Sequence, residues 1–91
     1  MTKFRKRPVV IEAVLCGDVL AALKGDRAGI PHWLAELLEK GLAVSGPSGI
    51  VLATPEGNMT AQKTDWIIRG IKTEVYPCKP DIFAATYEAV S

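Results

Sequence analysis

The sequence predicts an α+β fold, in which a small, twisted and largely antiparallel sheet packs against one main amphipathic helix. Two observations carry this prediction. A helical pattern introduced by a proline covers residues 31–40, and from residue 42 onward short apolar runs alternate with turn residues. The same pattern is compatible with a sheet that curls toward a small barrel.

The main helix is predicted from apolar residues that recur every three or four positions and therefore share one face. These residues are Ile30, Trp33, Leu34, Leu37, Leu38 and Leu42. Pro31 stands at the first helical position, where proline is tolerated, and Gly41 supplies the left-handed residue that ends a helix. We expect Leu42 to fold back on the last turn.

The elements before this helix are a strand and a short helix. Residues 8–15, PVVIEAVL, follow the basic start of the chain and are rich in β-branched residues, which predicts a strand. Asp18 is a good helix N-cap and Gly25 a good stop, so we expect a helix of about two turns between them.

The elements after the helix are predicted as antiparallel strands joined by turns. Glycine and proline at 46–49 and 54–57 predict two tight connections, and Pro80 opens a last helical turn in which Asp81 is the expected cap. We expect the first and last strands to pair with each other. The predicted strands are 42–45, 50–54, 58–62, 66–70, 74–78 and 86–90.

Length and charge indicate one domain with a basic arm. The chain has 91 residues, 48% of them apolar and 23% charged, which suits a single globular domain at residues 8–91. Four cations precede it in an N-terminal arm, residues 1–7, and the rest of the chain has seven basic and ten acidic residues, a net charge of −3. The four cations are Lys3, Arg5, Lys6 and Arg7.

The apolar segment behind this arm does not predict export or membrane insertion. Glu12 and Asp18 interrupt it, whereas a signal peptide needs an uncharged core of about 7–15 residues. No run reaches the 18 or more apolar residues of a membrane span. Cys16 and Cys78 are therefore expected to be reduced thiols in a cytoplasmic protein.

The residues that could support catalysis are few. Cys78 precedes Lys79, a cation that could lower the pKa of a thiol, and His32 is the single histidine that could serve as its base. No feature of the sequence brings Cys78 and His32 together, and cysteine is commonly buried in a core. We therefore expect no enzyme activity and no catalytic residue.

Cofactor and metal sites are not expected either. The cysteines and His32 lack the paired spacing of a zinc site, and the glycine-containing segments lack the spacing of a phosphate-binding loop. Acidic residues of the C-terminal third fall at turn, strand and cap positions, where backbone hydrogen bonds or solvent account for them. These residues are Asp65, Glu74, Asp81 and Glu88.

Two features could bind a macromolecule. The basic arm could neutralise nucleic-acid phosphates, although it could equally be a solvated end that protects a strand from wrong pairing. Trp66 and Tyr76 fall on neighbouring predicted strands, where aromatic residues usually belong to the core. If either aromatic is exposed, it would mark a surface for a protein partner.

Two long segments of the chain resemble a known family. They are KFRKRPVVIEAV, residues 3–14, and TPEGNMTAQKTDWIIRGIKTEVYPCKPDIFAATYEAV, residues 54–90. They resemble a group of small proteins encoded in tailed bacteriophages and prophages. The family usually has glycine where this chain has Thr64 and Thr73. The resemblance implies an accessory phage protein and supplies no catalytic residue to transfer.

The sequence thus favours a non-enzymatic phage accessory protein that binds a protein of the phage or of its host, without a cofactor. Three alternatives remain: a nucleic-acid-binding protein that uses the arm, a cysteine-dependent enzyme, and a minor structural protein of the virion. A homodimer formed through an exposed edge strand is also physically reasonable.

Overall fold

The computed structural model describes residues 2–5 and 8–90 and has an α+β fold, which confirms the predicted class. All strand pairs are antiparallel. The strands fall into two three-stranded sheets instead of one sheet, and no closed barrel forms in the described part of the chain. Among the described residues, three α-helices and one short 3-10 helix, Arg27–Gly29, complete the fold.

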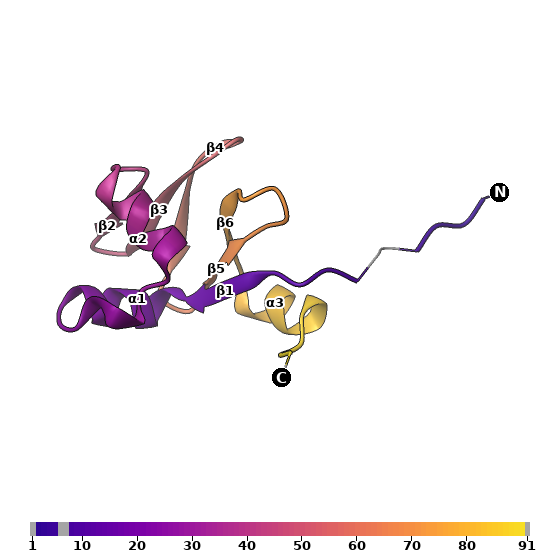
Figure 1. Ribbon diagram of the computed structural model, residues 1–91, viewed down its shortest axis with the longest axis horizontal. Helices are drawn as coiled ribbons and strands as arrows, with labels where there is room; N and C mark the ends of the chain where they lie inside the picture. Colours follow the sequence, from indigo (N-terminus) through magenta and orange to yellow (C-terminus); the bar gives the residue numbers. More distant parts are fainter. Residues whose placement is uncertain (1, 6–7, 91) are drawn as a thin grey trace.

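The first sheet, sheet A, has the strand order β1-β5-β6 (Figure 1). Its central strand places Trp66 opposite Leu15 on one side and opposite Cys78 on the other. The strands are β1 (Glu12–Leu15), β5 (Trp66–Arg69) and β6 (Val75–Cys78).

The second sheet, sheet B, has the order β2-β3-β4 and is made of two consecutive hairpins. Both predicted turns are confirmed, because Gly46 faces Gly49 across the first and Thr54 faces Gly57 across the second. The strands are β2 (Ala43–Gly46), β3 (Gly49–Thr54) and β4 (Gly57–Gln62).

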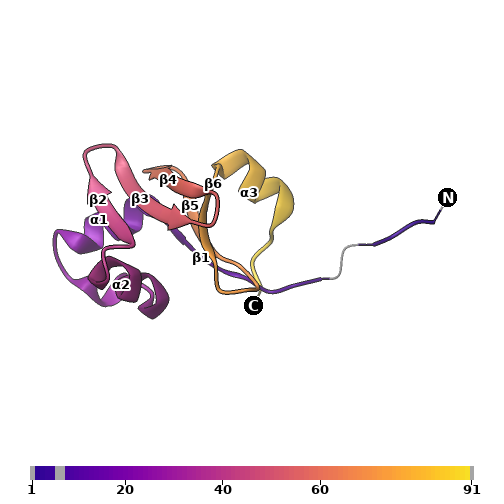
Figure 2. The ribbon, with the colours of Figure 1, turned by 90° about the horizontal axis from the view of Figure 1, so that it is seen from above.

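The helices lie at opposite ends of the molecule. Figure 2 shows α1 and α2 together at one end and α3 at the other, with the strands between them. They are α1 (Cys16–Leu23), α2 (His32–Glu39) and α3 (Pro80–Thr86). Sheet A therefore has α3 and the C-terminal segment near one end, and α1 and α2 near the other.

The end of α2 follows the sequence prediction closely. Gly41 has φ +74°, and its N–H donates to Leu38 O at 3.3 Å while the N–H of Leu42 donates to Leu37 O at 2.9 Å. This pair of hydrogen bonds is a Schellman motif, which satisfies carbonyls that would otherwise lack a partner. At the other end, Pro31 is the N-cap and the helix begins at His32, one residue later than predicted.

The start of α1 differs from the prediction. The helix begins at Cys16, directly after β1, and Asp18 lies within its first turn instead of capping it. The N–H groups of Cys16 and Gly17 donate to Asp65 O and Lys63 O, each at 2.9 Å. Backbone carbonyls of the 63–65 turn therefore accept the hydrogen bonds that a side-chain cap would otherwise accept. A local sequence pattern cannot reveal this contact, because the turn is distant in sequence.

The predictions for the two termini were wrong. Lys79 and not Asp81 is the N-cap of α3, although Pro80 is its first residue as expected. Residues 87–90 form no strand, and β1 pairs with β5 instead of with the C-terminal segment. Residues 8–11 also lie outside β1, because β5 offers only four residues and these pair with Glu12–Leu15.

The core lies where the inner faces of the two sheets meet α1 and α2. Ile50 and Leu52 alternate along β3 on the buried face, and Ile67 from β5 packs into the same cluster. Val19 of α1 and Leu34 of α2 are fully buried there. Of the apolar face predicted for α2, Leu34 is fully buried, and Trp33, Leu37 and Leu38 are partly buried against the core. Leu42, which follows the helix, is 45% exposed.

The turn between β5 and β6 contains an unusual threonine. Thr73 has φ +65° and is the one non-glycine residue with a positive φ among residues 2–5 and 8–90. Its N–H donates to Gly70 O at 3.1 Å, and the N–H of Gly70 donates to Glu74 O at 2.8 Å. This geometry is a type I turn followed by a left-handed bulge position, where glycine is the usual residue.

Replacing Thr73 by glycine should therefore stabilise the protein. A β-branched residue is strained at positive φ, and the gain from relieving this strain exceeds the added entropy of the unfolded chain, for a net gain of about 0.5–1 kcal/mol. Thr64→Gly is the matched control, because Thr64 has no positive φ to relieve. Urea unfolding should show a higher midpoint for Thr73→Gly and a lower one for Thr64→Gly, and the opposite order would contradict this account.

Candidate binding groove

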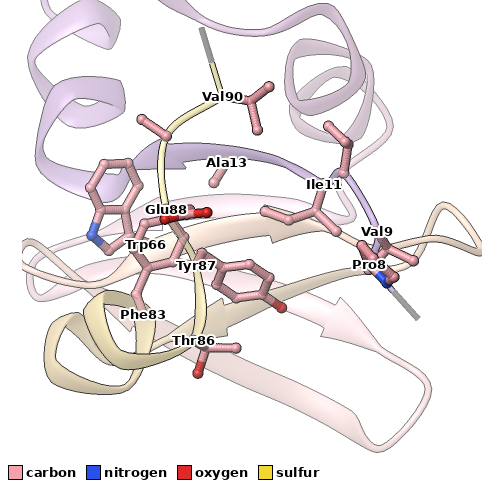
Figure 3. Close-up of a pocket in the computed structure, with 12 residues that line it drawn as sticks. Pro8, Val9, Ile11, Ala13, Trp66, Phe83, Thr86, Tyr87, Glu88 and Val90 are labelled. Carbon is pink, nitrogen blue, oxygen red and sulfur yellow. The ribbon is translucent and has the colours of Figure 1, made fainter. Parts of the chain in front are cut away.

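The two terminal segments enclose a groove of about 840 Å³. Residues 8–11 and Ala13 form one wall, and residues 86–90 form the other (Figure 3). Residues 8–11 and 86–90 therefore face each other across a groove and do not form the strand pair that the sequence predicts. We call this cavity the terminal groove.

Stacked aromatic rings line the terminal groove. The rings of Trp66 and Phe83 are nearly parallel, with centroids 4.3 Å apart and an angle of 9° between their planes. Tyr87 follows at 5.2 Å from Phe83 with a tilt of 39°. This order arises because β5 presents Trp66 toward α3, and one helical turn separates Phe83 from Tyr87. The stack gives the groove a rigid apolar surface.

The rim of the groove is apolar and open to solvent. Val10 is 77% exposed and Val90 is 74% exposed, one on each wall. Glu88 also lines the groove and is exposed, so the rim carries one carboxylate. Apolar side chains on both walls of one groove are more informative than scattered ones, because a contiguous apolar patch commonly marks an interaction site.

The two aromatic residues singled out from the sequence have different positions. Trp66 and Tyr76 are both half-buried, and only Trp66 lines the terminal groove. Phe83 and Tyr87 form the rest of the aromatic surface. No periodic sequence pattern could reveal this cluster, because its members come from β5, α3 and the segment after α3.

The basic arm is partly described. Lys3 and Arg5 are exposed, and Phe4 between them has 94% of its surface exposed. Lys6 and Arg7, the other two predicted contact residues, lie outside the described residues. Residues 2–5 lie away from the helices and sheets (Figure 1).

A second, smaller cavity of about 400 Å³ lies between β4, β6 and the start of α3. Asp65 lines it and is 1% exposed. Its Oδ2 accepts from the N–H of Gln62 at 2.9 Å and from Lys79 Nζ at 3.1 Å, while Oδ1 has no hydrogen-bond partner among the described residues. Asp65 accepts a backbone hydrogen bond within its turn, as the sequence predicts. The sequence did not predict that its carboxylate is almost completely buried.

The environment of Cys78 disfavours the thiolate form. Burial raises the pKa of Cys78, and the carboxylates of Asp65 and Asp81 raise it further. The nearby Lys79 cation instead pairs with Asp65. His32 lies at the start of α2, which packs against β2, whereas Cys78 ends β6 in the other sheet. The structure thus does not place His32 in the cavity that Cys78 lines.

Three buried or half-buried acids make stability sensitive to alkaline pH. Burial raises the pKa of the Cys16 and Cys78 thiols from 9.0, and burial followed by the neighbouring Tyr87 raises the pKa of Tyr76 from 10.0 to about 12. Each group binds its proton more tightly in the folded state. Their contribution to stability is therefore complete below about pH 9 and is lost as the pH rises toward 12.

Urea unfolding at a series of pH values should accordingly show a midpoint that falls steadily above pH 9. Tyr76→Phe should flatten the part of this decline that lies above pH 10, because the phenylalanine has no proton to lose. A midpoint that stays constant or rises between pH 8 and pH 11 would contradict the raised pKa values.

Residues 2–5 and 8–90 show neither a cluster of metal-binding side chains nor a membrane-spanning helix. These residues include no group of three or more histidine, cysteine or acidic side chains that could hold a metal ion. None of the described helices is long and apolar enough to cross a membrane.

Comparison with known proteins adds no assignment to this geometry. No protein-family model, curated protein or solved structure matches the chain significantly. The terminal groove and its surroundings therefore supply the physical basis for a proposal about function.

Proposed function

We propose that this protein is a non-enzymatic accessory protein of a bacteriophage or prophage that binds another protein of the phage or its host. The observation that carries the binding proposal is the terminal groove, whose aromatic stack lies between two walls with exposed valines. The phage origin is supported by the family resemblance of residues 3–14 and 54–90.

An extended polypeptide segment fits the shape of the groove. The two walls are themselves short lengths of chain without helix or strand structure, at residues 8–11 and 87–90. A segment laid between them would cover the valines and stack an apolar or aromatic side chain on Trp66 or Phe83. Aromatic anchors in such pockets commonly carry much of the binding energy of a protein interface.

Site-specific photo-crosslinking tests the proposal. A photoreactive residue at Val10, on the groove rim, should capture a specific protein in host cells that carry the phage. The same residue at Ile71, which is 71% exposed in the turn between β5 and β6, is the control position. Capture of the same proteins from both positions would reject the groove as the binding site.

A pair of arginine substitutions sharpens this experiment. Thr86 and Ala85 are adjacent exposed residues at the end of α3, and only Thr86 lines the groove. Thr86→Arg should obstruct the groove and abolish capture from Val10, whereas Ala85→Arg should leave capture unchanged. Equal capture by both variants would also reject the proposal.

Nucleic-acid binding is the second candidate, and the exposed sequence Lys3-Phe4-Arg5 favours it. Two cations could contact phosphates while Phe4 stacks on a base. Binding of labelled DNA and RNA at two salt concentrations would test it, with Lys3→Glu/Arg5→Glu as the comparison. Binding that weakens steeply with salt and is lost in this variant would favour nucleic acid, and no binding at low salt would exclude it.

A further inference from the structure

The terminal groove has apolar side chains at its rim that residues 2–5 and 8–90 leave uncovered. Val9, Val10 and Val90 are 40%, 77% and 74% exposed, and all three line the groove. Each exposed valine alone is ordinary, but three around one aromatic-lined groove form a continuous surface. Covering them would remove apolar area from water at a gain of about 25 cal/mol per Å².

The chain also carries an aromatic side chain, Phe4, that is almost fully exposed to solvent. Phe4 is 94% exposed, more than any other large apolar residue in the described part of the chain. It stands between Lys3 and Arg5, so an apolar ring is flanked by two cations. Residues 3–5 therefore offer an aromatic side chain that can insert into the groove and positive charges that can face its carboxylate.

The groove and this segment are complementary in chemistry and charge. Phe4 matches the apolar surface formed by Trp66 and Phe83, and aromatic pairs of this kind add to simple burial of area. Lys3 or Arg5 would then lie near Glu88 on the rim. At a larger scale, the arm has a charge of +4 and residues 8–91 have a net charge of −3.

We propose that a second copy of this chain fills the terminal groove, in a symmetric dimer in which residues 3–5 of each copy lie in the groove of the other. This inference rests on the proposed function, because it names an occupant for the same groove. Exchange between copies is favoured because residues 8–11 form one wall of the groove, whereas residues 2–5 lie away from the helices and sheets of their own chain (Figure 1). A twofold axis near this wall would bring each arm to the partner's groove, and the extended chain from Pro8 spans at most about 14 Å to Phe4 and about 18 Å to Lys3.

Sedimentation velocity of the purified full chain over a range of concentrations tests this dimer. We expect the wild type to dimerise and Phe4→Ala to raise the dimer dissociation constant at least tenfold, because an aromatic anchor is lost. Ile71→Ala removes an apolar side chain of similar exposure outside the groove and should leave the constant unchanged.

A charge reversal provides a second and independent test. Lys3→Glu/Arg5→Glu and Glu88→Lys should each weaken the dimer, since each places like charges together. Combining all three substitutions should restore at least part of the lost affinity, because the pairing is then re-formed with reversed signs. Absence of any restoration would overturn the placement of the arm beside Glu88.

Several outcomes would overturn the inference. A chain that remains a monomer at all concentrations has no second copy in its groove. A monomer in which Phe4→Ala changes the tryptophan fluorescence would show that the arm occupies its own groove. If the chain is a monomer and Val10 nevertheless captures a different protein, the proposed function stands and only the second copy is excluded.

Discussion

Replacing Gly49 by alanine is expected to destabilise the protein by at least about 4 kcal/mol, a large part of the stability of a small domain. A Cβ at Gly49 would lie 1.8 Å from Ala61 O and 2.9 Å from Ala61 C. The backbone at Gly49 also has φ +151°, a conformation that other residues rarely adopt. The substitution therefore requires the backbone of β4 to move.

Movement of β4 is costly because Ala61 is fixed from several directions. Ala61 pairs with Ile50, is fully buried, and accepts a hydrogen bond from Cys16 Sγ at 3.4 Å. Displacing it would disturb the β3–β4 ladder and the start of α1 together. The cost thus comes from backbone collision in the core and not from a lost side-chain contact.

Gly46→Ala is the matched control, since Gly46 lies in the same hairpin. A Cβ at Gly46 would come no closer than 4.0 Å to a neighbouring atom, so its effect should stay below about 1 kcal/mol. Urea unfolding followed by circular dichroism would compare the two variants. Equal midpoints for Gly49→Ala and Gly46→Ala would show that the β4 backbone can move without lowering the free energy of unfolding.

Replacing Asp65 by alanine is expected to cost about 2–3 kcal/mol, because a buried carboxylate has both structural and electrostatic partners. Without it, the Gln62 N–H and Lys79 Nζ lose their acceptor. The 62–65 turn would loosen, and with it the carbonyls that receive the first N–H groups of α1.

Asp65→Asn separates the two parts of this effect. An asparagine keeps an oxygen for Gln62 N–H but loses the charge that pairs with Lys79, whose side chain is 54% exposed. Since solvent screens an ion pair with one exposed partner, the loss should be about 1 kcal/mol. Chemical unfolding at low and moderate salt would measure both variants, and an Asn variant as unstable as the Ala variant would assign the main effect to charge.

The accuracy of the sequence prediction depends on how local each signal is. Gly41 ends α2 as expected, because the Schellman hydrogen bonds join residues within one turn of each other. The hairpins of sheet B were predicted for the same reason, since their turns hold glycine and proline between strands that pair immediately. These elements depend little on the rest of the chain.

The errors concern contacts between distant parts of the chain. Asp18 was expected to cap α1 because it is the nearest residue of the right kind, yet carbonyls of the 63–65 turn receive the N–H groups. The terminal strand at 86–90 was expected from its apolar residues, which instead line one wall of the terminal groove. The local pattern of apolar residues is the same whether residues 86–90 pair as a strand or line the groove.

The candidate site was predictable only in part. Trp66 was recognised as a residue whose exposure would mark a partner surface, but the groove also requires Phe83, Tyr87 and both terminal segments. The basic residues Lys3 and Arg5 were recognised from charge alone. The complementarity between Phe4 and the aromatic stack depends on exposure, which a sequence pattern does not report.

The pairing of β1 with β5 has a consequence for the order in which the protein folds. Sheet B is formed by hairpins between neighbouring strands, whereas β1 must wait for a partner about 50 residues further along the chain. Loop closure over that distance is slower than hairpin formation. During synthesis, β1 leaves the ribosome long before β5, so sheet B is expected to form first and the terminal groove last, when α3 arrives. The groove thus becomes available for binding only after residues 86–90 have been synthesised.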